Sequence, residues 1–450
     1  MRSLLCHSLF AAGALVATAC GSNNGNGPTF DAKPADVIDA TPPPPDACVG
    51  LECKKVDCST MGGGTTTLSG IVYAPNGTLP LSGVTVYVPN ADPGPIPEGV
   101  QCNKCNDTLA GQPVSQVNTD EAGHFVLPDV PVTADLPVII QVGKWRRQIT
   151  IPTVAACTDT PVDAALTRLP RNHTEGDMPK IALSTGGADA LECLPLKLGI
   201  DPAEITTGSE TGRVNLFVGS GGGTSAFDST FAGGARTLSN ATTFWNTESN
   251  LDKYDIVMLS CEGSEYEDQK SPTALQNMYD YANKGGRVFA THYHYYWINA
   301  APQPWPMALT LNDTGDFIDV TATVDETFDK GKALATWLVN VGASTVHGKI
   351  DIADGRNIAK AINSALAQQY IYLEASTGYT GPQISQFTTP LDVQEADRCG
   401  KVVYSDMHVS TSSFPGDAYP LGCSADLTPQ EKALAFVFFD IASCVGPIIN

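Results

Sequence analysis

The pattern of apolar and polar positions changes twice along the chain. Residues 21–47 show no apolar periodicity and are rich in Asn, Gly, Asp and Pro, with four consecutive prolines. From residue 65 to residue 170, runs of Val, Ile and Thr alternate with polar residues at period two and are separated by Gly, Pro and Asn turns. The first pattern predicts a semi-extended tether without a core, and the second predicts an antiparallel β-sandwich.

From Met178 onward, short apolar strands alternate with helical patterns. The expected strands lie in PKIALSTGG, GRVNLFVGSGGG, KYDIVMLSCEG, GGRVFATHYH and CGKVVYSDMHVS, and the expected helices lie in ADALECLPLKLGI, SPTALQNMYDYANKGG, KGKALATWLVNVG, RNIAKAINSALAQQ and TPQEKALAFVFFDIASCV. This alternation predicts an α/β doubly wound domain over residues 178–447, with a mostly parallel sheet covered on both faces. Right-handed crossovers then bring the carboxyl ends of the strands to one edge, where sites form.

The N-terminal residues 1–19 have the layout of a secretory signal peptide, with one arginine, an apolar stretch and small residues before Cys20. The stretch ATAC at 17–20 resembles a bacterial lipobox, which implies that Cys20 is the lipidated first residue of the mature protein. Residues 20–64 then form a lipid-anchored, Pro-rich tether with a cysteine cluster. Because no later run of about 18 apolar residues follows, the body of the protein is expected to be soluble and at most tethered.

Charge and cysteine content narrow the class of protein. The 26 Lys and Arg against 48 Asp and Glu give a net charge of −22, which disfavours nucleic acid as a partner. Of 13 cysteines, Cys6 leaves with the signal and Cys20 carries the lipid, so an odd number remains and Cys261 is the candidate free thiol. Six clustered cysteines predict structural disulfides that staple a small N-terminal unit, namely Cys48, Cys53, Cys58, Cys102, Cys105 and Cys157.

Three short stretches in the period-two region resemble the carboxypeptidase regulatory-like, prealbumin-type domain. They are GIV at 70–72, PLSGVTV at 80–86 and TDEAGHF at 119–125, and the resemblance covers residues 66–168. It implies a non-catalytic sandwich. The stretch His173-Thr174-Glu175 that follows has the wrong spacing for the usual zinc-peptidase pair.

The order KYDIVMLSCEG, helix, GGRVFATHYH and, later, CGKVVYSDMH resembles the class I glutamine-amidotransferase-like fold, including its trehalose-utilisation-protein-like branch. In catalytic members, the second strand ends in a sharp turn that presents a cysteine nucleophile, and a histidine after the late strand activates it. His408 falls at the matching late position, and His292 stands where the cysteine would be. Amide transfer through a thioester needs a thiolate, so the resemblance implies a domain that lacks its nucleophile.

Three hypotheses remain for this edge of the sheet. Period two places His292 and His294 on one face of their strand and Asp406 and His408 on one face of theirs. If the two strands are neighbours in the sheet, these residues would supply zinc ligands for a metal-dependent hydrolase. A thiol enzyme would instead use Cys261 and His408. In the third hypothesis, the histidines form structural hydrogen bonds among packed aromatic residues, and the edge holds no cofactor.

The whole chain resembles a myxobacterial-type exported lipoprotein. Its expected function is non-catalytic binding or interaction in the cell envelope, with the lipid anchor in the outer membrane or at the cell surface and an envelope protein or a glycan as ligand. The expected ligand pocket is formed by residues at the carboxyl edge of the sheet, namely Glu262, His292, His294, Asp406 and His408.

Overall fold

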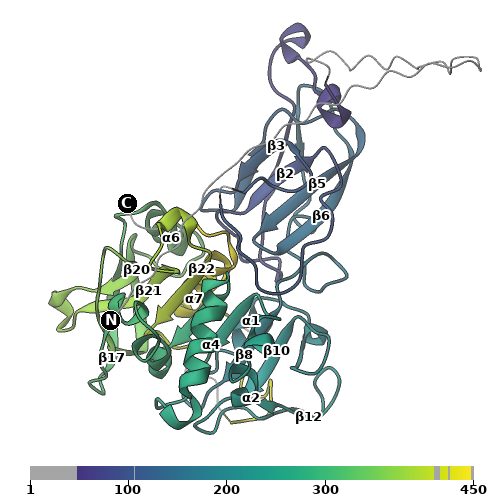
Figure 1. The fold of residues 1–450 in the computed structure, drawn as a ribbon. Helices are drawn as coiled ribbons and strands as arrows, with labels where there is room; N and C mark the ends of the chain where they lie inside the picture. Colours follow the sequence, from purple (N-terminus) through teal and green to yellow (C-terminus); the bar gives the residue numbers. More distant parts are fainter. Residues whose placement is uncertain (1–47, 106, 410–415, 424–425, 447–450) are drawn as a thin grey trace, which may run out of the picture. The chain divides into compact units, whose positions relative to one another are not determined.

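The computed structural model describes residues 48–105, 107–409, 416–423 and 426–446. One compact unit begins at Cys48, so the predicted signal peptide, Cys20 and the tether up to residue 47 lie outside the described residues. Residues 48–64, assigned to the tether from the sequence, belong to the compact unit and contain the 3-10 helices η1 (Gly50–Lys54) and η2 (Cys58–Met61). The described chain is rich in β-structure, and its strands form five sheets (Figure 1).

Two of the sheets are built from the region with period-two alternation. One has the order β3-β2-β5-β6 and the other β4-β1-β7. Their strands are β1 (Thr67–Ile71), β2 (Thr85–Pro89), β3 (Pro113–Asn118), β4 (His124–Leu127), β5 (Ala134–Val142), β6 (Trp145–Thr153) and β7 (Asp159–Pro161). Along β4, exposed and buried positions alternate, as the sequence predicts. Both sheets contribute side chains to one apolar core, including Leu68, Val86, Phe125 and Val138.

The largest sheet has eleven strands, in the order β13-β10-β8-β14-β15-β22-β21-β20-β17-β18, with β9 also paired to β10. Its strands are β8 (Ile181–Thr185), β9 (Ile205–Thr207), β10 (Val214–Val218), β13 (Ser239–Asn240), β14 (Ile256–Leu259), β15 (Arg287–Thr291), β17 (Phe317–Val324), β18 (Lys349–Arg356), β20 (Ala367–Leu373), β21 (Gly381–Thr389) and β22 (Gly400–Ser405). Pairing is parallel from β13 to β22 and antiparallel from β22 to β18. The parallel half was expected, and the antiparallel half was not.

Apolar side chains are buried on both faces of the parallel half. In β15, Val288 and Ala290 belong to one core cluster and Phe289 belongs to the other. The Val288 side is covered by α2 (Ala241–Trp245), α4 (Pro272–Asn283) and α5 (Tyr296–Asn299), and the Phe289 side by α1 (Cys193–Lys197), α6 (Asp329–Asn340) and α7 (Pro429–Ala442). Burial on both faces explains why these strands read as continuous apolar runs.

Local signals explain where the longer helices begin. Ser271 caps α4 by accepting a hydrogen bond from the Ala274 amide, and Pro272 occupies the first helical turn. Thr428 and Glu431 form a capping box at the start of α7. After α4, Gly285 adopts φ +124, a conformation that glycine tolerates and that turns the chain into β15.

The helix predicted for RNIAKAINSALAQQ is wrong. The segment forms β19 (Ala359–Ile362) and β20, joined by a turn in which the Asn363 side chain accepts a hydrogen bond from the Ala365 amide. Strand β19 pairs with β16 (Leu309–Leu311), and β20 pairs with β21. Pairing with the earlier strand β16 and with β21, the next strand in the sequence, has overridden a weak local helical preference.

All six predicted disulfide cysteines are bonded, but the pairing differs from the expected N-terminal staple. The bonds are Cys48–Cys53, Cys58–Cys157, Cys102–Cys399, Cys105–Cys444 and Cys193–Cys423. Two of them therefore join the N-terminal region to the last part of the chain, because spacing alone does not determine connectivity. Within the described ranges, Cys261 is the one free cysteine, as predicted.

These disulfides indicate an exported or extracellular protein, since such bonds persist in oxidising compartments. None of the helices in the described part of the chain combines the length and the apolar character needed to cross a membrane.

Candidate metal centre

The ends of three neighbouring parallel strands bring Cys261, His292 and His408 together. Strand β15 lies between β14 and β22, and Thr291 at its end is in register with Ser405 at the end of β22. The chain therefore leaves the three strands at one edge of the sheet, which is where parallel sheets place their sites. The sequence had left open whether β15 and β22 are neighbours, and the structure pairs them directly.

His292 occupies a sharp turn between a strand and a helix. Strand β15 ends at Thr291, the 3-10 helix η5 (His292–Tyr295) follows, and α5 begins directly after it. His292 has φ +41, a backbone region that residues other than glycine rarely adopt. Turns of this kind present nucleophiles in other α/β proteins, and here the turn presents an imidazole.

Backbone carbonyls fix the orientation of both imidazoles. His292 Nε2 donates to the Asp406 carbonyl at 2.9 Å, and His408 Nδ1 donates to the Asp354 carbonyl at 2.9 Å. Since a carbonyl can only accept, the remaining nitrogens, His292 Nδ1 and His408 Nε2, carry lone pairs. Both are buried, and neither has a hydrogen-bond partner among the residues that the structure describes. The two ring centroids are 3.5 Å apart.

The Cys261 thiol completes a group of three donors. The Cys261 sulfur, one ring nitrogen of His292 and one ring nitrogen of His408 all lie within 4.8 Å of one another and can each act as a metal ligand. A tetrahedral ion with bonds of about 2.0 to 2.3 Å separates its donors by about 3.3 to 3.8 Å. Movements of about 1 Å therefore suffice to bring all three donors onto one ion of the zinc type.

Burial sets the protonation state of these groups. It lowers the pKa of His292 well below its usual range and the pKa of His408 to about 4, so both imidazoles are neutral at pH 7, the form that binds metals. It also raises the pKa of the Cys261 thiol to about 12, although the backbone amides of Tyr293 and Gly263 lower it. A thiol with such a pKa is a poor nucleophile, but a bound metal ion deprotonates it.

The structure does not assemble the predicted metal set of His292, His294, Asp406 and His408. The prediction assumed an extended strand, whereas η5 rotates successive side chains by about a third of a turn and separates His294 from His292. His294 Nε2 donates to the Ser260 carbonyl at 2.8 Å, and its Nδ1 accepts from Trp297 Nε1 at 3.1 Å. Both of its nitrogens are therefore occupied.

The two carboxylates expected at this edge are also engaged in internal contacts. Asp406 accepts from the amides of Ile358 and Ala359 at 2.9 and 2.8 Å and from the Tyr404 hydroxyl at 2.7 Å. Glu262 accepts from the Ser220 amide and forms a buried ion pair with Lys270 at 2.7 Å. Neither residue lies in the group formed by Cys261 and the two histidines.

Two buried polar residues near this edge were missed from the sequence. Asp189 follows β8 and accepts from the Val409 amide at 3.0 Å, and burial raises the pKa of its carboxyl to about 8. Its position after a parallel strand is a signal that could have found it. Arg356, at the end of β18, comes from the antiparallel half that the sequence did not predict, so no signal pointed to it.

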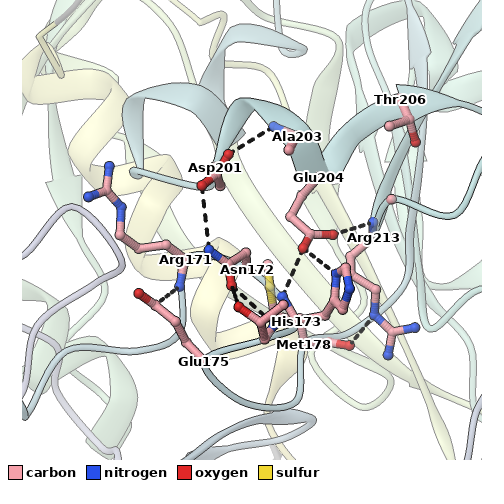
Figure 2. Close-up of polar contacts among 12 residues, drawn as sticks. Arg171, Asn172, His173, Glu175, Met178, Asp201, Ala203, Glu204, Thr206 and Arg213 are labelled. Carbon is pink, nitrogen blue, oxygen red and sulfur yellow. Dashed lines mark hydrogen bonds and ion pairs between the residues drawn. The ribbon is translucent and has the colours of Figure 1, made fainter. Parts of the chain in front are cut away.

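A second polar cluster surrounds the buried carboxylate of Glu204 (Figure 2). Glu204 is 1% exposed and accepts from the His173 amide at 2.8 Å, from His173 Nδ1 at 2.5 Å and from the Arg213 amide at 3.0 Å. Nearby, Glu175 forms an ion pair with Arg168 at 2.6 Å, and hydrogen bonds from Arg168 lower the pKa of that carboxyl to about 2. The His173-Thr174-Glu175 stretch thus makes structural contacts.

Comparisons with known proteins add no family. Neither a protein-family model nor a curated protein sequence matches the chain. Two similar solved structures are an N-terminal and a C-terminal interface mutant of a type II cohesin–X-dockerin complex from Acetivibrio cellulolyticus. They are 19% and 18% identical, with TM-scores of 0.17 and 0.18, and each comparison covers 30% of this chain and 85% of the other. TM-scores this low carry no argument about fold or function.

Proposed function

We propose that this protein is an exported metal-binding protein that holds one ion of the zinc or copper class through Cys261 Sγ, His292 Nδ1 and His408 Nε2. The observation that carries the proposal is the pair of buried imidazole nitrogens without partners, each on a ring whose other nitrogen is fixed by a carbonyl. Metal-ligating histidines are oriented in this way. A thiolate with two imidazoles suits zinc or copper, whereas magnesium and calcium prefer oxygen ligands.

Binding of an ion agrees better with the burial of these residues than catalysis on a large substrate. Cys261 is 1% exposed, His292 0% and His408 9%. A substrate such as a peptide or a glycan cannot reach groups buried to this extent without displacing the surrounding chain. The raised pKa of Cys261 further disfavours the thiol enzyme that uses Cys261 and His408.

The wider architecture is part of the same proposal. We infer a signal peptide at 1–19, a lipidated Cys20 and its tether, a carboxypeptidase regulatory-like sandwich at 65–170, and a doubly wound, amidotransferase-like domain without its nucleophile at 178–447. The signal-like N-terminus and the disulfides support export, and the lipobox supports a lipid anchor at the outer membrane or cell surface. A Cys20→Ala variant should be released from the membrane fraction, and unchanged retention would contradict the anchor.

Metal titration of purified, metal-free protein tests the central proposal. The protein should bind one Zn²⁺ or one Cu⁺ per chain, and separate titrations with the two ions determine which is preferred. His292→Asn, which retains a residue type that tolerates φ above zero, and Cys261→Ser should each weaken binding by about 100-fold or more, as loss of a ligand removes several kcal/mol.

His294→Gln is the matched control for these variants. His294 is buried beside the centre, but both of its ring nitrogens already have partners. This variant should keep the metal affinity of the wild type within about threefold. Equal losses in His294→Gln and His292→Asn, or no binding by the wild type, would refute the proposed centre.

A further inference from the structure

Arg356 carries a buried positive charge that the described protein does not neutralise. Its side chain is 5% exposed and forms no ion pair with a carboxylate in the described ranges. The guanidinium carbon lies 4.1 Å from the ring centroid of Phe317 and 5.2 Å from that of Tyr293, and Nη2 donates to the Tyr293 hydroxyl. Its Nη1 is buried and has no partner in the part of the chain that the structure describes.

The buried guanidinium of Arg356 has no counter-ion among the described residues. The guanidinium remains protonated at every physiological pH, and a buried charge without a counter-ion is costly. Stacking on two aromatic rings offsets part of that cost. The unpartnered Nη1 therefore points to a negatively charged ligand.

Hydrogen bonds place Arg356 beside the proposed metal centre. The Arg356 amide donates to the Asp406 carbonyl at 2.8 Å, and the same carbonyl accepts from His292 Nε2. Tyr293, the partner of Nη2, directly follows His292, and its amide faces the Cys261 sulfur. Burial is the main cause of the lowered pKa values of His292 and His408, and the charge of Arg356 lowers both further.

We propose that the metal ion takes a small monovalent anion as its fourth ligand and that Arg356 Nη1 binds this anion. The inference rests on the proposed metal centre. Three protein ligands leave the fourth position of a tetrahedral ion open. A divalent ion with one thiolate keeps one positive charge, Arg356 adds a second, and an anion between them reduces the buried charge. Asp189 Oδ2 is the protein group that would compete for this position.

The test uses Co²⁺-loaded full-length protein and azide as the probe anion, followed by the visible spectrum of the cobalt. Azide should shift the spectrum of the wild type. In Arg356→Met, Co²⁺ affinity should stay within about threefold while azide binds about tenfold or more weakly, because a charge-assisted hydrogen bond is lost. Arg356→Lys should fall between the two.

The outcomes separate this inference from the function on which it rests. Absence of Co²⁺ binding overturns the metal centre and the anion site together. Normal Co²⁺ binding with no response to azide, or with equal azide affinity in the wild type and both Arg356 variants, overturns the anion site alone. An azide response that appears only in Asp189→Asn also overturns it, since Asp189 would then be the fourth ligand.

Discussion

The cluster around Glu204 and the cluster of Cys261, His292 and His408 differ in one decisive respect. Around Glu204, both carboxylate oxygens accept hydrogen bonds, from His173 and from the Arg213 amide (Figure 2). At the ends of β14, β15 and β22, two imidazole nitrogens lack any partner among the described residues, and a thiol lies beside them. Glu204 is as buried as the two histidines, although its partner His173 is exposed, and the two clusters differ in whether the protein itself satisfies the buried polar atoms.

This difference separates a structural role from a binding role. A satisfied cluster stabilises the fold and needs nothing from outside, whereas unpaired buried acceptors cost free energy until a ligand binds them. We therefore expect metal to raise the free energy of unfolding through the cluster of Cys261, His292 and His408, and mutation of Glu204 to lower the free energy of unfolding of the metal-free protein.

The largest expected effect is stabilisation by metal. At a free Zn²⁺ concentration about 1,000 times the Kd, the free energy of unfolding should rise by about 4 kcal/mol, because the ion binds only the folded chain. His292→Asn should reduce this gain to about 1.4 kcal/mol or less, and Glu204→Gln should leave it unchanged. Thermal unfolding with and without Zn²⁺ measures it; an equal gain in His292→Asn would remove the distinction between the clusters.

The second effect is the cost of breaking the satisfied cluster. Glu204→Ala should lower the free energy of unfolding by about 3 kcal/mol, because it leaves the His173 and Arg213 amides without their acceptor. Glu204→Gln, which keeps an acceptor oxygen, should cost about half as much. Denaturant unfolding of metal-free protein measures both, and a loss under about 1 kcal/mol in Glu204→Ala would contradict the structural role.

The third effect is a pH dependence of the metal-free protein. His408 has a pKa of about 4 in the folded state, below its ordinary value of 6.5, because it is buried. As pH falls from 6.5 to 4, the unfolded chain binds a proton that the folded chain does not, so folding stability is lost.

His408→Gln should remove this contribution. Relative to the wild type, the variant should gain about 2 to 3 kcal/mol in the free energy of unfolding between pH 6.5 and pH 4. Urea unfolding at several pH values checks the difference. Parallel pH profiles for the two proteins would show that His408 titrates normally in the folded state.

The smallest effect is that of Cys261→Ser on metal-free protein. The hydroxyl is close in shape to the thiol, and the backbone amides of Tyr293 and Gly263 can still donate to it. The free energy of unfolding should change by less than about 1 kcal/mol, although metal affinity falls steeply. A larger loss without metal would assign Cys261 a packing role instead.

Much of the fold follows from the sequence because period-two and strand–helix patterns are local. The parallel strands, the shared edge and the positions of His292 and His408 after their strands were predicted. The disulfide connectivity joins distant segments and came only from the structure. The antiparallel strands β21, β20, β17 and β18 were also missed, although β20, β21 and β22 pair with their neighbours in the sequence.

The residues of the candidate site were likewise predicted only in part. Period two assigned His294 and Asp406 to the metal set, but η5 breaks that period directly after β15. Cys261 was recognised as a free thiol, yet its convergence with both histidines depends on how β14 pairs with β15. Arg356 lies at the end of β18, a strand that was not predicted from the sequence, so no pattern pointed to it.

The measurement that tests the account most directly is the absorption spectrum of the protein titrated with Co²⁺. We expect one Co²⁺ to bind per chain with a thiolate-to-cobalt charge-transfer band, and this band should disappear in Cys261→Ser and persist in His294→Gln. A spectrum without that band, or a band that Cys261→Ser leaves unchanged, would contradict a metal centre at Cys261, His292 and His408.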